Sequence, residues 1–282
     1  MNELDPVLEF VRRNSKCDIG AYNDATLERC LGERLSATGN KDIPEYLAYL
    51  HHRPDEMDKL LNVLTINYSH FFRETLTFEY IEQIIFPAMF AAKRSGNDRM
   101  IRIWSAGCAG GEEPYSIAIL VKHLIEKEDL KIMVFGTDVD ESALAMAREG
   151  SFSFEAVKHM KYELVEKYFI REAGRFKIAP EIKQLVVLAR HDLTDAGSKV
   201  PSESVYGDFD MVFCRNVLIY LRGDAQKCVI KRLHHSLAPG GVLVLGRAED
   251  LLPASWGDLR KVSDACPIWK KEAVSQLVTA TP

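Results

Sequence analysis

A glycine-rich turn followed by two carboxylates is the chemical pattern that stands out first in the sequence. The stretch 106–111 reads Ala-Gly-Cys-Ala-Gly-Gly, and Glu112 and Glu113 follow it directly. Glycines at a turn between a strand and a helix let the backbone approach a ligand closely, although a simple tight turn would use the same residues. Two acids at this place would repel a pyrophosphate, so the pattern disfavours NAD, ATP and a dehydrogenase activity.

A carboxylate at the end of the next apolar run suggests a ribose site. Asp138 stands at that end, and Asp140 and Glu141 follow it. Such a carboxylate can accept hydrogen bonds from ribose hydroxyls, but Asp138 or Asp140 could instead cap a helix that begins at Glu141. A nucleoside without a pyrophosphate describes S-adenosylmethionine, whose amino group Glu112 or Glu113 could hold.

Polar residues also follow the third and fourth apolar runs. Asp192 lies shortly after the third, where its side chain could reach an adenine edge or simply begin a loop. Arg215, Asn216 and Tyr220 follow the fourth and would lie at the mouth of a crevice, where a substrate enters. By spacing alone, Tyr220 could instead be an ordinary aromatic residue on a helix face, just as Arg73, far upstream, could be a surface charge.

The apolar runs themselves predict a parallel sheet that brings these polar residues together. The runs occupy 101–106, 132–137, 185–189, 209–214 and 242–246. Helical patterns separate several of them, so we expect right-handed βαβ units and one sheet edge at which the polar residues meet. Before residue 90 the spacing of apolar residues is helical: Gly39 would end one helix, Asp42 would cap the next, and a further helix would run from Leu76 to Ala92.

Four segments together resemble the CheR-type chemotaxis receptor methyltransferases. In chain order they are Asn-Tyr-Ser-His-Phe-Phe-Arg-Glu (67–74), Trp-Ser-Ala-Gly-Cys-Ala-Gly-Gly-Glu-Glu-Pro-Tyr-Ser-Ile-Ala (104–118), Gly-Thr-Asp-Val-Asp (136–140) and Phe-Cys-Arg-Asn-Val-Leu-Ile-Tyr (213–220). Their combination is specific, and the resemblance covers nearly the whole chain. It implies an enzyme that transfers the methyl group of S-adenosylmethionine to glutamate side chains of chemoreceptor cytoplasmic signalling helices. The products would be S-adenosylhomocysteine and glutamate methyl esters, which adjust chemosensory adaptation.

The resemblance also implies which residues bind the cofactor. The set comprises Asn67, Ser69, Arg73, Glu113, Asp138, Asp192, Leu193, Cys214, Arg215 and Asn216. Asn67, Ser69 and Arg73 would reach the methionine end of S-adenosylmethionine. Asp138 would hold the ribose.

Further roles come with the same resemblance. Asp192 with Leu193 would border the adenine, and Cys214 would line the edge of the fourth strand. Arg73 and Tyr220 would form the catalytic pair that orients substrate and cofactor. No metal ligand is implied.

These observations give the expected fold class and domain organisation. We expect an α/β protein with a small all-helical N-terminal domain at 1–75, which docks the substrate, and a linker helix region at 76–98. A doubly wound, Rossmann-like S-adenosylmethionine methyltransferase domain would occupy 99–282. A small antiparallel β-subdomain would be inserted in that domain at about 160–184.

Composition limits the expected environment and partners. The chain has 282 residues and a formal net charge of -5, which argues against a dedicated nucleic-acid binder. Its six cysteines form no CxxC pair and no cluster with zinc spacing, and the first residues lack the basic flank and apolar run of a secretory signal. No stretch approaches the ~20 apolar residues that span a bilayer. We therefore expect a cytoplasmic monomer that neither binds nucleic acid nor inserts into a membrane.

Two features depart from the family pattern. The N-terminal domain of this family tends to present a basic helix to an acidic receptor. Here residues 1–66 carry eight basic and twelve acidic residues, and Glu28 and Glu33 cancel Arg29 and Arg34 within the expected docking helix 23–37, so electrostatic steering toward an acidic receptor is weakened. Family members that tether to a C-terminal receptor peptide carry a glycine-containing loop insertion in the β-subdomain. The corresponding segment 169–176 is short here, so we expect no tether. The alternative functions are a methyltransferase of the same fold that acts on a non-receptor protein, and a non-catalytic signalling module that binds the cofactor.

Overall fold

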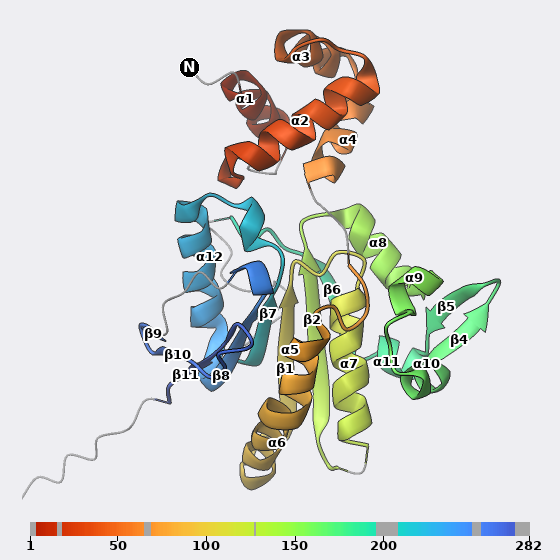
Figure 1. The fold of residues 1–282 in the computed structure, drawn as a ribbon, viewed down its shortest axis with the longest axis vertical. Helices are drawn as coiled ribbons and strands as arrows, with labels where there is room; N and C mark the ends of the chain where they lie inside the picture. The colour runs from red at the N-terminus through yellow and green to blue at the C-terminus, as the bar shows by residue number, and fades with distance from the viewer. Residues whose placement is uncertain are drawn as a thin grey trace, which may run out of the picture.

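The computed structural model of the chain describes residues 4–15, 19–64, 69–126, 128–195, 208–249 and 255–273. Figure 1 shows a helical domain at one end of a central sheet, and a small second sheet that projects from the side. Within the described ranges, no helix is both long and apolar enough to cross a bilayer.

The described part of the N-terminal domain is helical. It contains α1 (Asp5–Asn14), the 3-10 turn η1 (Ile19–Ala21), α2 (Asp24–Thr38), α3 (Ile43–His52) and α4 (Pro54–Leu64). The expected helix ends are confirmed: Gly39 ends α2 in the left-handed region with a φ of 75°, and the Asp42 side chain accepts a hydrogen bond from the Glu45 N–H at the start of α3. The apolar faces of these helices meet in one core that includes Leu31 and Leu60.

A buried ion pair joins α2 to α4. Arg34 Nε donates to Glu56 Oε1 at 2.8 Å, Arg34 Nη2 donates to Glu56 Oε2 at 3.0 Å, and the Tyr46 hydroxyl donates to Glu56 Oε1 at 2.9 Å. Only 1% of Glu56 is exposed, and burial raises the pKa of Tyr46. One of the two arginines of the expected docking helix is thus held against α4 and not directed toward a partner.

The described strands of the large domain form a central sheet of eight strands. Its order is β6 (Val186–Arg190), β2 (Lys131–Asp138), β1 (Met100–Ala106), β7 (Phe209–Cys214), β8 (Leu237–Leu245), β11 (Ile268–Lys271), β10 (Leu259–Lys261) and β9 (Ser255–Trp256). The strands from β6 to β8 pair in parallel, whereas β8, β11, β10 and β9 pair antiparallel. The five predicted strands are confirmed, and the fifth begins earlier than predicted, at Leu237.

Helices cover both faces of this sheet. One face is covered by α5 (Thr75–Tyr80), the π turn η2 (Ile81–Ile85), α6 (Phe86–Ser95) and α7 (Glu112–Leu124). The other face is covered by α12 (Gly223–Ser236). A further helix, α8 (Glu141–Glu149), contacts β2 and β6. Ile103 packs with the first group and its neighbour Trp104 packs with α12. Successive residues of a strand point to opposite faces, so the uninterrupted apolar runs belong to strands that are buried on both sides. The fold is therefore doubly wound, as predicted.

A three-stranded antiparallel sheet is inserted between β2 and β6 in the chain. Its order is β3 (Ser151–Phe152), β5 (Arg175–Ile178) and β4 (Phe169–Glu172), and α9 (Phe154–Val157), α10 (Tyr162–Tyr168) and α11 (Pro180–Lys183) accompany it. The predicted antiparallel insert is confirmed, and its first strand precedes residue 160. β4 and β5 meet in a tight turn at Ala173 and Gly174, whose φ angles are 48° and 76°.

Candidate active site

Two adjoining pockets lie at the carboxyl ends of the central strands. In the central sheet, β2 lies on one side of β1 and β7 lies on the other, so the strand order reverses at β1. Ligands of doubly wound sheets bind at such a reversal. The larger pocket, of about 670 Å³ including the open solvent at its mouth, is lined by Tyr22, Leu64, Gly107, Ala109, Asp138, Val139, His191, Asp192, Leu193, Thr194, Asn216, Val217, Tyr220 and Leu221. The smaller pocket, of about 440 Å³, is lined by Ser69, His70, Arg73, Phe78, Gly107, Cys108, Ala109, Glu113, Arg215 and Asn216. Three residues line both, so the pockets are contiguous.

The glycine-rich turn after β1 forms the wall between the two pockets. Gly107 has a φ of 79°, and a Cβ atom there would lie 2.3 Å from Val217 Cγ2, so only glycine fits. The Gly107 and Cys108 N–H groups donate to the Thr137 carbonyl at 2.8 and 2.9 Å. The turn is thereby tied to the end of β2, where Asp138 begins the next wall.

Asp138 and Asp140 have different roles, although on sequence grounds either could have capped the helix after β2. Asp140 Oδ1 accepts from the Ser142 and Ala143 N–H groups at 2.8 and 3.2 Å, so Asp140 caps α8. Asp138 lines the larger pocket, where its Oδ2 accepts from the Ala109 N–H at 2.8 Å and its Oδ1 from the Asp140 N–H at 3.0 Å. Burial raises the pKa of Asp138, while these two N–H donors lower it. Each carboxylate oxygen can accept a further hydrogen bond.

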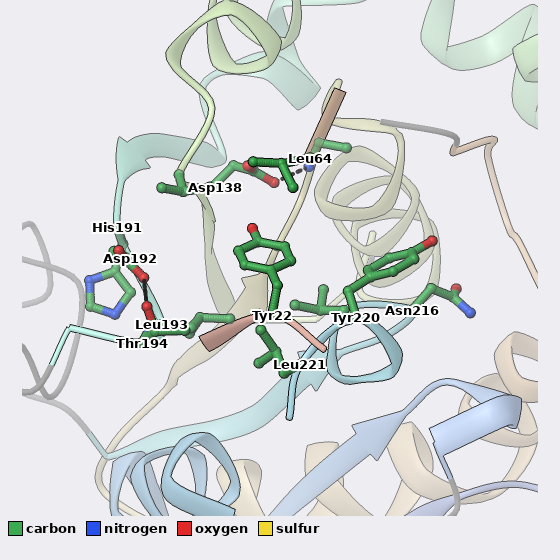
Figure 2. Close-up of a pocket in the computed structure, with 14 residues that line it drawn as sticks. Tyr22, Leu64, Asp138, His191, Asp192, Leu193, Thr194, Asn216, Tyr220 and Leu221 are labelled. Atoms are coloured by element: carbon green, nitrogen blue, oxygen red, sulfur yellow. Dashed lines mark hydrogen bonds between the residues drawn. The ribbon is translucent and has the colours of Figure 1, made fainter. Parts of the chain in front are cut away.

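The end of β6 supplies another wall of the larger pocket. Asp192 Oδ1 accepts from the Thr194 N–H at 2.8 Å and from the Thr194 hydroxyl at 2.6 Å, so this carboxylate shapes the loop as well as lining the pocket. Figure 2 shows Asp138 and Asp192 on one side of the pocket, Asn216 and Tyr220 on the other, and Tyr22 between them. Leu193 adds an apolar surface beside Asp192.

Arg215 is the central charge of the smaller pocket. Only 1% of its side chain is exposed, its Nη1 donates to Glu113 Oε2 at 2.8 Å, and its Nη2 lies 3.2 Å from Glu74 Oε2. Its Nη2 also donates to the Arg73 carbonyl, and its guanidinium lies 5.4 Å from the centre of the Phe78 ring. The buried cation therefore connects the segment before α5, the start of α7 and the end of β7.

The segment before α5 reaches this pocket through an unusual backbone. Phe72 and Glu74 both have left-handed φ angles, of 54° and 60°, which are rare for residues other than glycine. Phe72 N–H donates to the Ser116 hydroxyl at 3.0 Å, and Ser69 and Arg73 line the smaller pocket. Asn67, which was also expected here, lies outside the described residues.

Glu249 organises the turn after β7, a role that the sequence did not reveal. It ends the 3-10 turn η4 (Arg247–Glu249) and is fully buried. Its carboxylate accepts from five backbone N–H groups at 2.5 to 3.2 Å, namely those of Asn216, Val217, Leu218, Ile219 and Gly246. Burial raises the pKa of Glu249, whereas these donors lower it. The signal in the sequence was an acid four residues after the last parallel strand.

The turn held by Glu249 contains the predicted residues Asn216 and Tyr220. Asn216 is left-handed, with a φ of 59°, and lines both pockets. Tyr220 ends the 3-10 turn η3 (Leu218–Tyr220), not an α-helix face, and lines the larger pocket. Cys214 instead has its side chain in the core between the sheet and α12, where burial raises its pKa well above the usual value.

Two further pocket residues were not expected from the sequence. Tyr22, from the helical domain, lines the larger pocket, which no local pattern could indicate. Glu74 had no role in the sequence analysis beyond ending the segment 67–74, yet it pairs with Arg215, and its carboxylate also accepts from the Arg247 N–H at 3.2 Å. Both contacts depend on segments that are distant in the chain.

Comparisons with known proteins agree with this geometry. The family model described as CheR methyltransferase, SAM binding domain, matches residues 67–264, and the one described as CheR methyltransferase, all-alpha domain, matches residues 2–65. The chain is 31% identical to chemotaxis protein methyltransferase 2 of Vibrio cholerae over 80% of this chain and 77% of that protein. It is 28% identical to a chemotaxis protein methyltransferase of Borreliella burgdorferi over 89% of this chain and 88% of that one. It is also 29% identical to an uncharacterized 104.1 kDa protein of Rhodobacter capsulatus, of which it spans only 27%.

Proposed function

The chain belongs to the CheR methyltransferase family, and we propose that it methylates glutamate side chains on the cytoplasmic helices of chemoreceptors. It is an S-adenosylmethionine-dependent methyltransferase. The observation that carries the proposal is the pair of contiguous pockets, one with the Asp138 carboxylate and the other with the buried Arg215 cluster. A nucleoside would occupy the first and the amino-acid end of the cofactor the second, and the Glu113 carboxylate that lines the second would repel a pyrophosphate.

The residues present fit S-adenosylmethionine. Asp138 retains acceptor capacity for ribose hydroxyls, and Asp192 with Leu193 offers a polar and an apolar edge to adenine. Glu113 and Arg73 line the smaller pocket, where the amino and carboxyl groups of the methionine end would be held. When bound, the cofactor supplies an electrophilic methyl group on a sulfonium.

The substrate carboxylate needs no general base. A glutamate side chain has a reference pKa of about 4.3 and is ionised at neutral pH. The protein must instead remove water from a hydrated, weakly nucleophilic carboxylate and hold one oxygen in line with the methyl carbon and the sulfur. Arg73 would orient the carboxylate, and Tyr220 would donate a hydrogen bond near the acceptor or the cofactor. A tight Arg73–carboxylate pair would lower nucleophilicity, so orientation is the role that we assign to Arg73.

Tyr220→Phe should lower turnover more than cofactor affinity. Loss of a hydrogen bond to a charged group would reduce the rate of methyl transfer about tenfold to a hundredfold. Methyl transfer and calorimetric titration of S-adenosylhomocysteine measure the two quantities. Tyr162→Phe, at a residue that is 71% exposed in the small subdomain, is the matched control and should change neither. Equal losses of rate and affinity in Tyr220→Phe would contradict the role.

Asp138→Asn should weaken cofactor binding and remove its pH dependence. Burial holds the pKa of Asp138 above its usual value, and donation from ribose hydroxyls would favour the ionised form, so binding would release protons. Affinity in the wild type should therefore fall as the pH is lowered through that raised pKa. Calorimetry at a series of pH values from neutral pH downward should show this fall in the wild type, and an affinity about tenfold to a hundredfold weaker and pH-independent in Asp138→Asn. Asp140→Asn keeps a good helix cap but removes a carboxylate whose charge also raises the pKa of Asp138, so its pH response should persist and move to lower pH. A pH response that survives in Asp138→Asn would refute the assignment.

Incubation with methyl-labelled S-adenosylmethionine and receptor cytoplasmic fragments tests the function. We expect base-labile label on glutamates, located by mass spectrometry. Label on a non-receptor protein alone would favour the alternative methyltransferase, and cofactor binding without any transfer would favour the signalling module. Fragments with and without the C-terminal receptor tail should be modified equally, because the short turn at Ala173 and Gly174 offers little surface for a tether. We further propose that the protein acts as a cytoplasmic monomer.

A further inference from the structure

The start of α2 is hydrogen-bonded to the turn that carries Tyr220. Asn23, the N-cap of α2, accepts from the Thr26 N–H through Oδ1 at 2.8 Å. Its Nδ2 donates to the Ile219 carbonyl at 2.9 Å, and its backbone N–H donates to the Tyr220 carbonyl at 2.9 Å. The Asn23 side chain therefore caps the start of α2 in the helical domain and also binds the active-site turn, 196 residues further along the chain.

Neighbouring residues extend this contact into a short antiparallel pairing. Tyr22 forms an isolated β-bridge with Leu221, and the Arg222 N–H donates to the Ala21 carbonyl at 2.8 Å. The pairing places the Tyr22 ring in the larger pocket, in which Tyr220 also lies (Figure 2). The helical domain is thus part of the wall of the cofactor site.

The two sides of the turn are held by different partners. Glu249 accepts from the N–H groups of residues 216–219, which ties that side to the end of β8. Asn23 donates to the carbonyls of Ile219 and Tyr220, which ties the other side to α2. Without the Asn23 amide, the backbone bonds of residues 21–23 and the Gln226 bonds to the Leu218 and Leu221 carbonyls would remain on this side of the turn. The Ile219 carbonyl, next to Tyr220, would lose its donor, and the Tyr220 hydroxyl would sample a wider range of positions.

We propose that Asn23 is a positioning residue that fixes Tyr220 and couples the helical domain to the site of methyl transfer. The inference rests on the proposed function and on the role of Tyr220. Because Asn23 is both the cap of α2 and the donor to the turn, a displacement of the start of α2 moves the Ile219 and Tyr220 carbonyls with it. A partner that docks along α2 acts on the turnover of this enzyme by that route.

Two substitutions at Asn23 separate this role from helix stability. Ser and Asp are both good N-caps, so neither Asn23→Ser nor Asn23→Asp should destabilise α2. Asn23→Ser removes the donor to Ile219 and should lower kcat about threefold to tenfold. Asn23→Asp also places a carboxylate against that carbonyl and should lower kcat about tenfold to a hundredfold. The dissociation constant of S-adenosylhomocysteine should change less than about twofold in either variant, since the pocket wall is kept.

Asp42→Ser is the matched control, because Asp42 caps α3 in the same domain through the same kind of bond to Glu45. It should leave kcat unchanged, and deuterium exchange of the 218–222 peptide should rise in both Asn23 variants but not in Asp42→Ser. An unchanged kcat in Asn23→Asp, an equal loss in Asp42→Ser, or unaltered exchange of the turn would overturn the inference. The exchange measurement needs no substrate, so it tests the coupling of the helical domain to the turn even if the wild type methylates no receptor fragment. Failure to methylate any receptor fragment would count against the proposed function alone.

Discussion

Arg215→Met is expected to abolish measurable cofactor binding and to lower the free energy of unfolding by about 3–5 kcal/mol. The Arg215 side chain is 1% exposed, and it lies between the carboxylates of Glu113 and Glu74, whose side chains are 12% and 19% exposed. Its removal leaves two largely buried carboxylates without their shared partner and takes a donor from the Arg73 carbonyl. Denaturant unfolding and calorimetric titration with S-adenosylhomocysteine measure the two effects.

Arg34→Met separates the loss of binding from the loss of stability. Arg34 also forms a buried bidentate pair, with Glu56, but in the helical domain and away from both pockets. It should lower stability by a comparable amount and leave cofactor affinity unchanged. Combining Arg215→Met with Glu74→Gln and Glu113→Gln should recover most of the stability, because removal of a whole buried ionic cluster is far less costly than removal of one partner. Cofactor binding should not return, and its return would show that the charges are not needed for it.

Glu249→Gln should lower turnover at least about a hundredfold and stability by about 2–5 kcal/mol. Oε1 accepts from Val217, Leu218 and Ile219, and Oε2 accepts from Asn216 and Gly246. A glutamine amide must place its NH₂ group against one of these sets of N–H donors, so at least two buried donors lose their acceptor. The turn that carries Asn216 would then lose part of its attachment to the end of β8.

A surface control makes the Glu249 result interpretable. Glu155→Gln carries the same chemical change at a side chain that is 73% exposed, and its effect on stability should stay within about 0.5 kcal/mol. Methyl transfer and denaturant unfolding are measured for both variants. A Glu249→Gln protein with normal turnover would mean that the five N–H donors do not need a charged acceptor to hold the turn.

The sheet and the ends of its strands were predictable from the sequence for a physical reason. Strands buried on both faces must be apolar throughout, and polar residues shortly after each run mark the crevice edge. Asp138, Asp192 and Arg215 were found in this way, and they do meet at one edge of the sheet. The pattern could not decide whether Asp138 or Asp140 caps α8, because both stand before the same helix and only the backbone conformation separates them.

The contacts that complete the site were not predictable, because they join residues that are distant in sequence. Glu74 reaches Arg215, and Glu249 reaches back to the turn after β7, through packing that no spacing encodes. Asn23 was recognisable as the start of a helix, but its second bond, to Ile219, was not. The π turn at Ile81–Ile85 was not predictable either, because the apolar spacing of this stretch is typical of an ordinary helix.

The pairing between residues 21–23 and 220–222 has a consequence for hybrid proteins. A chimera that joins this helical domain to the catalytic domain of a relative creates a junction in which the cap residue and the tyrosine-bearing turn come from different parents. Both halves could fold well and yet turn over poorly, because the β-bridge and the Nδ2 bond are made to backbone atoms of the turn, whose positions depend on how the two parents pack together. Exchange of receptor specificity between family members therefore requires that residues 21–23 and the turn that they hold be transferred together from the same parent.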